Sequence, residues 1–240
     1  MSDTEQLPAR LRAALEQDPT VNLHSHPVEL SVRDDELYIE GEVDDVATKR
    51  IIHRHAVLLA DHIAIHDRLR RRVDEPRGDA AIRDAVEESF HEESAFRNYR
   101  IDVDTVIPES AEEHAIGIVV DGGVVRLSGQ VESLTHRRLA EVYAWWHQGV
   151  RDVDNRIHVI PPEQDNDGEL HDAIRLVLER DPWIDHGQVQ VQIQDRMVVV
   201  QGLLPSTEQV HMAEHDVWCV RGVHGVDNRI QVAPGGGNPA

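Results

Sequence analysis

The sequence is poor in cysteine, lysine and aromatic residues, and it has no long apolar run. Its one cysteine, Cys219, cannot form a disulfide within the chain, so a secreted disulfide framework has no support. No apolar run approaches the ~20 residues that a membrane-spanning helix needs. Residues 1–6 also lack the basic segment and the apolar core of an export signal. We therefore expect a cytoplasmic protein that does not span a membrane.

Sequence motifs for catalysis are absent as well. There is no Gly-x-Ser-x-Gly elbow, no glycine-rich phosphate-binding loop, and no base placed near the single cysteine in a catalytic pattern. Scattered carboxylates are what this composition gives in any case. We predict no enzyme, no catalytic residue and no cofactor.

The sixteen histidines raise the question of a metal site. His211 and His215 lie one helical turn apart and are weak candidates, but a zinc site needs three or four ligands and the spacing supplies no others. The run 165–169 resembles the start of a calcium loop. Ile174 stands where that loop needs a bidentate glutamate, so we predict no metal.

Acidic residues dominate what is present. The 45 acidic side chains outnumber the 24 basic ones and give a net charge of -21, which repels nucleic acid and anionic lipid at long range. Nucleic-acid binding is therefore disfavoured. Lys49 is the only lysine, and two explanations of this composition stay open: adaptation to concentrated salt, or a genome rich in G and C.

Two segments of the chain repeat each other without a gap. In each, a glycine that ends an alternating run is followed after twenty residues by Gly-Val, and after twenty-six by an asparagine. A third copy near the N-terminus is degenerate, because Asp61-His62 replaces Gly-Val and Asp67 replaces the asparagine. The conserved spacing picks out Gly129, Gly149, Val150 and Asn155 in one copy, Gly202, Gly222, Val223 and Asn228 in another, and Gly41 in the degenerate one.

Each copy has the same succession of hydrophobic patterns. Leu170, Ile174 and Leu178 recur at helical spacing, and the runs 189–193 and 198–204 alternate as in a hairpin. Ser206 then begins a second helix, and a final strand follows. The crossover through that helix makes the last strand parallel to the second. The sequence predicts an α+β fold of three tandem α-β-β-α-β repeats, each a three-stranded mixed sheet covered on one face by two helices.

The repeat boundaries follow from these patterns. We predict repeats at 5–71, 79–160 and 168–233, and a disordered tail at 234–240. The second repeat carries an insert at about 97–113, whose alternating residues 101–106 are compatible with an additional edge strand before an exposed loop at 108–113. The charged or proline-bearing segments 72–78 and 161–168 are expected to be flexible joints between three compact units.

The pattern Val-x-Leu-x-Gly, a helix with spaced alanines, and Gly-Val-x-x-Val-x-Asn-x-Ile-x-Val resembles the BON domain, named for osmotically inducible periplasmic proteins and nodulation proteins. The resemblance implies a non-enzymatic binding module that contacts phospholipid surfaces in envelope stress. It implies a periplasmic setting as the alternative to the cytoplasm. One potassium-binding protein type carries the domain, so a soluble cation or small-ligand sensor is a second hypothesis. A purely structural protein-interaction module is the third.

The local roles of the motif residues can be predicted from chemistry. Gly149 and Gly222 are expected to form left-handed caps at helix ends, where a Cβ would be strained. Asn155 and Asn228 are expected to act as local hydrogen-bonding devices rather than as a polar site.

Tryptophans are the remaining candidates for a contact surface. Trp146 and Trp183 lie at the ends of predicted elements, where a large amphipathic ring suits a lipid headgroup layer or a partner protein. The alternative is that the rings seal helices to sheets or one repeat to the next. The partner predicted from the sequence is a phospholipid surface or an unidentified protein, with no nucleic acid.

Overall fold

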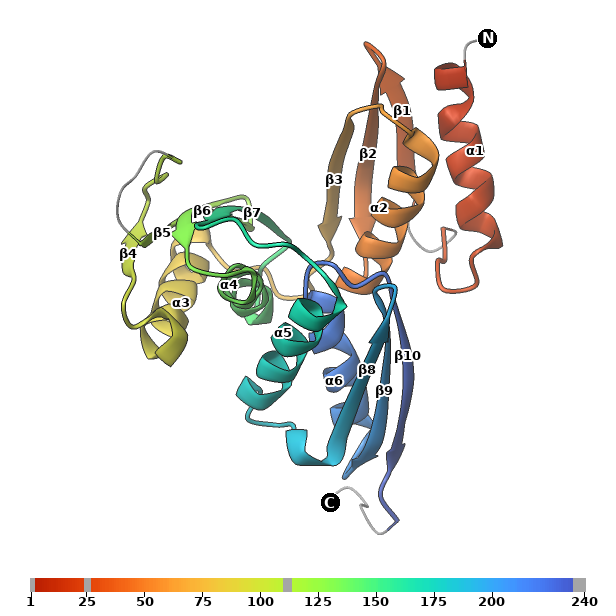
Figure 1. The fold of residues 1–240 in the computed structure, drawn as a ribbon. Helices are drawn as coiled ribbons and strands as arrows, with labels where there is room; N and C mark the ends of the chain where they lie inside the picture. Colours follow the sequence, from red (N-terminus) through yellow and green to blue (C-terminus); the bar gives the residue numbers. More distant parts are fainter. Residues whose placement is uncertain (1–2, 24–26, 110–113, 235–240) are drawn as a thin grey trace. The chain divides into compact units, whose positions relative to one another are not determined.

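The computed structural model describes residues 3–23, 27–109 and 114–234. The chain divides into two compact units, residues 1–74 and residues 75–240, and each is described by itself (Figure 1). The predicted disordered tail lies, except for its first residue, outside the described residues. No helix in the described ranges has the length and apolar character needed to cross a membrane.

The first unit is one α-β-β-α-β repeat. Its strands are in the order β1-β2-β3, with β1 antiparallel to β2 and β3 parallel to β2. Leu7, Leu11 and Leu15, spaced one helical turn apart, are buried together with Ile39 and Ile52 of the strand and helix opposite. The elements are α1 (Asp3–Gln17), β1 (Val28–Arg33), β2 (Glu36–Val43), α2 (Val46–Ala60) and β3 (Ile65–Arg71).

The second repeat differs from the predicted pattern by one strand. The insert forms β4, which pairs in parallel with β5 and makes a four-stranded sheet of order β4-β5-β6-β7. The three-stranded sheet is therefore wrong for this repeat, whereas the additional edge strand expected within 101–106 is confirmed at Arg100–Val103. The elements are α3 (Asp79–Glu92), the 3-10 turn η1 (Ser94–Phe96), β4 (Arg100–Val103), β5 (Ala115–Asp121), β6 (Val124–Val131), α4 (Leu134–Trp146) and β7 (Asp152–Val159).

The chain after β4 runs over the sheet rather than away from it. Ile107 is buried, and its N–H donates to the Ser128 hydroxyl at 2.9 Å. A Cβ on Gly117 would collide with the carbonyl oxygen of Thr105, so this strand position needs glycine to admit the crossing segment. Of the loop predicted at 108–113, residues 110–113 lie outside the described residues.

The third repeat returns to three strands. β9 lies in the centre, antiparallel to β8 and parallel to β10. The capping side chain of Ser206 accepts from the N–H of Gln209 and begins α6. The elements are α5 (Asp167–Arg180), the 3-10 turn η2 (His186–Gln188), β8 (Val189–Gln194), β9 (Met197–Leu204), α6 (Thr207–Cys219) and β10 (Gly225–Val232).

One strand glycine occupies the same place in all three repeats. Gly41, Gly129 and Gly202 have φ values of 139°, 110° and 153° and pair with the first or second residue of the preceding strand. A Cβ at each would approach the carbonyl oxygen of the residue before the paired one, Pro27, Ala115 or Gln188, to within 3.0 Å, closer than real Cβ atoms come. The degenerate first copy therefore keeps the backbone geometry of the other two.

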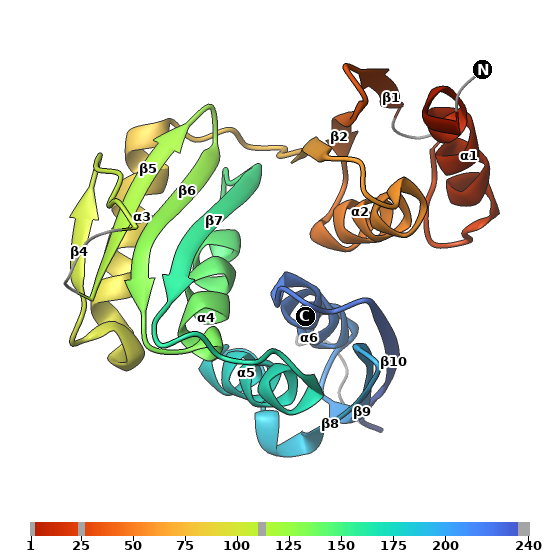
Figure 2. The ribbon, with the colours of Figure 1, turned by 45° about the horizontal axis from the view of Figure 1, so that its top comes forward.

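The second and third repeats belong to one unit, which differs from the prediction of three separate ones. Figure 2 shows α4 beside α5 and α6, with the sheets β5–β7 and β8–β10 on the outer sides of these helices. The helix face of one repeat thus covers that of the next.

Candidate functional site

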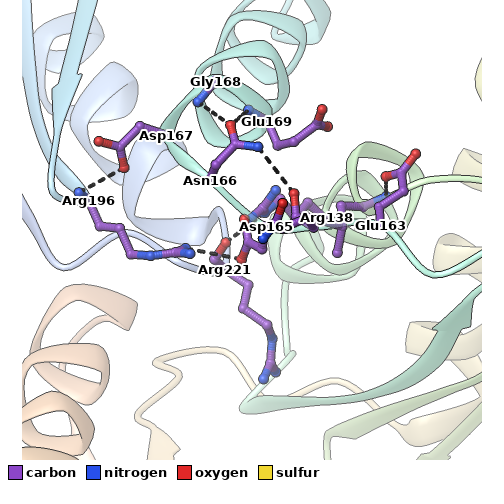
Figure 3. Close-up of polar contacts among 11 residues, drawn as sticks. Arg138, Glu163, Asp165, Asn166, Asp167, Gly168, Glu169, Arg196 and Arg221 are labelled. Carbon is purple, nitrogen blue, oxygen red and sulfur yellow. Dashed lines mark hydrogen bonds and ion pairs between the residues drawn. The ribbon is translucent and has the colours of Figure 1, made fainter.

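The segment that joins the second and third repeats is held by ion pairs. Asp165 accepts from Arg138 of α4 at 2.6 Å and from Arg196 of the β8–β9 turn at 3.1 Å (Figure 3). Burial alone would raise the pKa of Asp165, but the hydrogen bond and the charge of Arg138 lower it. Glu163 accepts from the N–H of Leu134 at the start of α4. The segment predicted as a flexible joint is therefore bonded to both repeats.

The next residues of this segment begin α5. The Asn166 side chain accepts from the N–H groups of Gly168 and Glu169, which is an N-cap. Asp167 accepts from the N–H groups of Asp195 and Arg196 in the hairpin turn. The oxygens that would have served a calcium loop are thus engaged by the protein.

A buried carboxylate on α4 extends the same junction. Glu141 is almost fully buried and accepts from Arg221, after α6, at 2.7 Å and from Asn155 of β7 at 3.1 Å. The charge of Glu141 raises the pKa of Arg221. Arg138 also donates through Nε to the carbonyl oxygen of Arg221 at 2.8 Å. Two side chains of α4, Arg138 and Glu141, therefore hold Arg221 at the end of α6, and Asn155 of β7 bonds to one of them.

The other end of α4 carries a second set of contacts. Trp146 donates through Nε1 to the Asp216 carboxyl of α6 at 2.7 Å. Asp216 is only 1% exposed, and burial, together with the neighbouring Asp181, raises its pKa to about 9. This shift favours the neutral form of the Asp216 carboxyl at pH 7, which removes its repulsion with Asp181.

Glu93 links the first helix of the second repeat to α5. It is 4% exposed, forms an ion pair with Arg180 at 3.1 Å, and accepts from the Tyr143 hydroxyl at 2.5 Å. Burial works against its charge, but the hydrogen bond from Tyr143 and those from Ala95 and Ser94 lower the pKa of Glu93. Glu93 thus adds a further ion pair to the junction between the two repeats.

A small cavity opens in the middle of this junction. Its volume is about 60 Å³. The residues that line it come from α4, from the joining segment and from the end of α6: Leu134, Arg137, Arg138, Glu141, Asp165 and Arg221.

The repeated Gly-Val pairs lie in turns that lead into the last strand of each repeat. Gly149 (φ 92°) and Gly222 (φ 106°) follow helix caps at His147 and Val220 that are themselves extended. The N–H groups of Val150 and Val223 donate back three residues. The predicted positive φ of both glycines is confirmed, but the glycines are not the helix caps, because each is the third residue of a separate turn.

The repeated asparagine joins strand to helix in both copies. Asn155 donates to the carbonyl oxygen of Arg137 and to Glu141, and its own oxygen accepts from the N–H of Ile157. Asn228 donates to the carbonyl oxygen of Val210 and to Glu214, and its oxygen accepts from the N–H of Ile230. The asparagine oxygen thus makes the predicted local hydrogen bond within the strand, and the amide nitrogen adds tertiary hydrogen bonds to the helix.

The first repeat has the acidic residue on the strand and basic residues on the helix at these positions. Asp67 takes the place of the asparagine, and His53 and Lys49 replace the glutamate and the residue one turn earlier. Lys49 donates to Asp67 at 2.8 Å, and His53 lies 3.3 Å from it. Burial alone would raise the pKa of Asp67, but the bond from His53 and the charge of Lys49 lower it to about 2.

The two candidate contact tryptophans have different environments. Trp183 is 67% exposed, at the turn after α5. Trp146 is half-buried and bonded to Asp216 of the third repeat, which fits the alternative that its ring seals one repeat to the next. Trp145 and Trp218, at equivalent positions of α4 and α6, are buried. From the sequence alone, a tryptophan at a helix end is compatible both with an exposed contact surface and with burial between elements.

The histidine pair gains no further ligands. His215 lies 3.5 Å from the sulfur of Cys219, and His211 is exposed. Within the described residues, no group of three or more His, Cys, Asp and Glu side chains is arranged to hold a metal ion.

Sequence reasoning missed the residues that join the repeats. Arg138, Glu141 and Asp216 are polar side chains on the buried faces of helices, and their partners Asp165, Arg221 and Trp146 lie outside their own repeats. A signal was present in Glu141 and Glu214, which both stand fourteen residues before the repeated asparagine.

Comparison with known proteins supports the fold assignment. The BON domain profile matches residues 105–161 and 166–234. The chain belongs to the BON domain family. The match covers the second repeat from residue 105 onward and the whole third repeat of this BON protein, and it leaves the first unit outside, so three tandem BON domains are not established. No curated protein matches the chain.

Two solved structures are similar over most of the chain. One is the C-terminal domain of CdsD, a structural protein of the type III secretion system of Chlamydia trachomatis, at 14% identity, with 95% of this chain and 98% of that chain covered and a TM-score of 0.26. A second CdsD structure covers 95% and 93%, at 14% identity and a TM-score of 0.25. At these scores, the similarity carries no functional argument.

Proposed function

We propose that this BON protein is a non-enzymatic binding module that contacts a phospholipid surface, in the osmotic or envelope stress setting associated with its family. One observation carries the proposal. Trp183 is exposed at the end of the third repeat where β9 and β10 also terminate, and Leu203 and Val232 are exposed there, at 46% and 43%. We call Trp183, Leu203 and Val232 the apolar tip.

The elements that carry the residues of the apolar tip end at the same side of the third repeat. Gln209, in the first turn of α6, donates to the carbonyl oxygen of Trp183 at 2.7 Å. The same turn follows directly after β9, and β10 ends opposite β9, with Val232 paired to Leu204. Leu203 lies on the face of β9 opposite to the buried Leu204, and Val232 shares the face of Leu204, so the two aliphatic side chains are exposed on opposite sides of one sheet end. An exposed indole ring at the same end of the repeat suits the headgroup level of a bilayer.

Charge decides how such contact depends on salt. The net charge of -21 opposes approach to an anionic bilayer, and salt screens this repulsion beyond ~8 to 10 Å. Contact through the apolar tip is short-range. Binding should therefore persist or strengthen as the salt concentration rises, whereas a basic-patch mechanism gives the reverse.

The experiment is co-sedimentation with vesicles of zwitterionic and of anionic lipid, at low and high salt, with tryptophan emission recorded in parallel. We expect sedimentation, and a blue shift that Trp183→Ala removes. Leu58→Ala is the matched control, because Leu58 is 72% exposed but lies in the first unit. Absence of sedimentation under every condition, or equal sedimentation of Trp183→Ala and the parent, rejects lipid contact through the tip and favours a protein partner.

A further inference from the structure

Two guanidinium donors at the junction of the second and third repeats have no acceptor. Nη1 of Arg138 and Nε of Arg137 are buried and find no hydrogen-bond partner among the described residues. The remaining nitrogens of Arg138 donate to Asp165 and to the carbonyl oxygen of Arg221, and the residue as a whole is 3% exposed. A buried charged donor without an acceptor is costly, so these groups point to a missing partner.

Both arginines line the cavity of about 60 Å³. That volume is several times the ~10 to 15 Å³ that one water molecule needs. Arg221 lines it as well, so three guanidinium groups surround one small space. Guanidinium groups match the oxygens of a phosphate in both geometry and charge.

The carboxylates at the cavity already have cationic or amide partners. Asp165 receives Arg138 on one oxygen and Arg196 on the other. Glu141 receives Arg221 and Asn155. They therefore hold the arginines in place without supplying the acceptors that Arg137 and Arg138 lack.

The three cations also repel one another. Burial lowers the pKa of Arg137, and the charges of Arg221 and Arg138 lower it further, although Glu141 and Asp165 act in the opposite sense. An anion in the cavity would relieve this repulsion at short range. Three arginines around one cavity are unusual in a chain whose net charge is -21.

We propose that this cavity binds a phosphate group, with Arg137 and Arg138 as donors and Arg221 as a third cation. The phosphate belongs either to a free anion or to a lipid headgroup, since both present the same oxygens. The site lies at the start of α5 and the apolar tip at its end, roughly 20 Å away, so it does not depend on lipid contact through Trp183.

The test is calorimetric titration of the full chain with inorganic phosphate at pH 7.5, with chloride at equal ionic strength as the reference. We expect one saturable site. Arg137→Gln should weaken it by roughly tenfold, because one charge-assisted bond is lost. This variant should fold, since the Arg137 side chain makes no hydrogen bond that holds the junction. Arg156→Gln is the matched control, because Arg156 is exposed on the outer face of β7 and pairs with Asp154.

Further arms separate the two sources of phosphate. Glycerol phosphate tests a soluble ester, and phosphatidylcholine vesicles with and without phosphatidic acid test a headgroup. Saturable binding of the soluble anions alone assigns the site to a free phosphate; binding to phosphatidic acid that inorganic phosphate competes away assigns it to a headgroup. Phosphate heat no larger than that of chloride, or unchanged binding by Arg137→Gln, overturns the proposal and leaves the cavity to water.

Discussion

Single residues fix the backbone of each repeat, and the strand glycine has the strongest effect. Gly202 combines a φ of 153° with a carbonyl oxygen where its Cβ would stand. We expect Gly202→Ala to lower the free energy of unfolding by roughly 2 to 4 kcal/mol, since strain and overlap add. Urea unfolding followed by tryptophan fluorescence measures this, because all four tryptophans lie in residues 75–240.

The control for this change is another glycine with room for a side chain. Gly78 has an ordinary φ and nothing within 4 Å of an added Cβ, and it stands at the N-cap of α3. Gly78→Ser should therefore stay within about 0.5 kcal/mol of the parent. Equal unfolding midpoints for Gly202→Ala and Gly78→Ser would contradict the role assigned to the strand glycine.

The strand-to-helix contact of the first repeat depends on pH. The pKa of Asp67 is about 2 when folded, below the ordinary value of 3.8, so its stabilisation is present above pH 3.8 and is lost as the pH falls through 2. We expect Asp67→Asn to cost on the order of 2 kcal/mol at pH 7 and to flatten the stability profile between pH 4 and pH 2. Hydrogen exchange of the β3 amides reports on this unit.

The equivalent contact in the third repeat should respond in the opposite way. Asn228 lies 2.9 Å from Glu214, so Asn228→Asp places two carboxylates together without a lysine or histidine beside them. We expect a loss of about 1 to 3 kcal/mol at pH 7 that diminishes below pH 4. Adding Glu214→His should restore part of that loss. If the double variant is no more stable than Asn228→Asp alone, the histidine on the helix of the first repeat does not compensate for the aspartate on its strand.

At the scale of elements, α4 is the helix that joins two repeats. Trp146 of α4 donates to the buried carboxyl of Asp216 in α6. The pKa of Asp216 is raised from 3.8 to about 9, so the folded state loses stability as the pH rises from about 4 to 9. Asn in its place is neutral and can both accept from Trp146 and donate to Asp181. We expect Asp216→Asn to raise the melting temperature at pH 8, with little change at pH 4. Parallel melting profiles of variant and parent across this range would show that Asp216 does not carry the shifted proton.

The elements themselves were predictable from the sequence, because periodicity and caps are local. Ser206 and the ladder of Leu170, Ile174 and Leu178 predicted α6 and α5, and the structure has both. The predicted α+β class is confirmed. The path of the insert over β5 was not predictable, since it depends on the space that Gly117 leaves on a neighbouring strand.

The candidate site was not predictable for a related reason. Hydrophobic periodicity shows which face of a helix is buried, but it does not show whether the sheet of the same repeat or a neighbouring repeat covers that face. Trp145 and Trp146 are adjacent in α4, yet one is buried and the other contacts α6. Arg138 likewise reads as a surface arginine until α5 and the joining segment are in place.

At the scale of the whole molecule, the two joining segments differ although both are polar and exposed. Residues 72–78 separate the two compact units, whereas Glu163, Asp165 and Asn166 in the second segment bond to α4, to the β8–β9 turn and to α5. A segment held at several points opens less often, and a protease cleaves the open form. We therefore expect subtilisin to cleave first within 72–78 and to leave 75–240 largely intact.

Mass spectrometry of the early fragments measures the order of cleavage, and a variant tests its cause. Asp165→Ala removes the acceptor of Arg138 and Arg196 but leaves the prolines and the exposed backbone of the segment unchanged. We expect cleavage within 161–168 to appear early in this variant and cleavage at 72–78 to keep its rate. If the parent is cut at both segments at equal rates, the ion pairs of Asp165 do not hold the second and third repeats together, and three independent units describe the chain better.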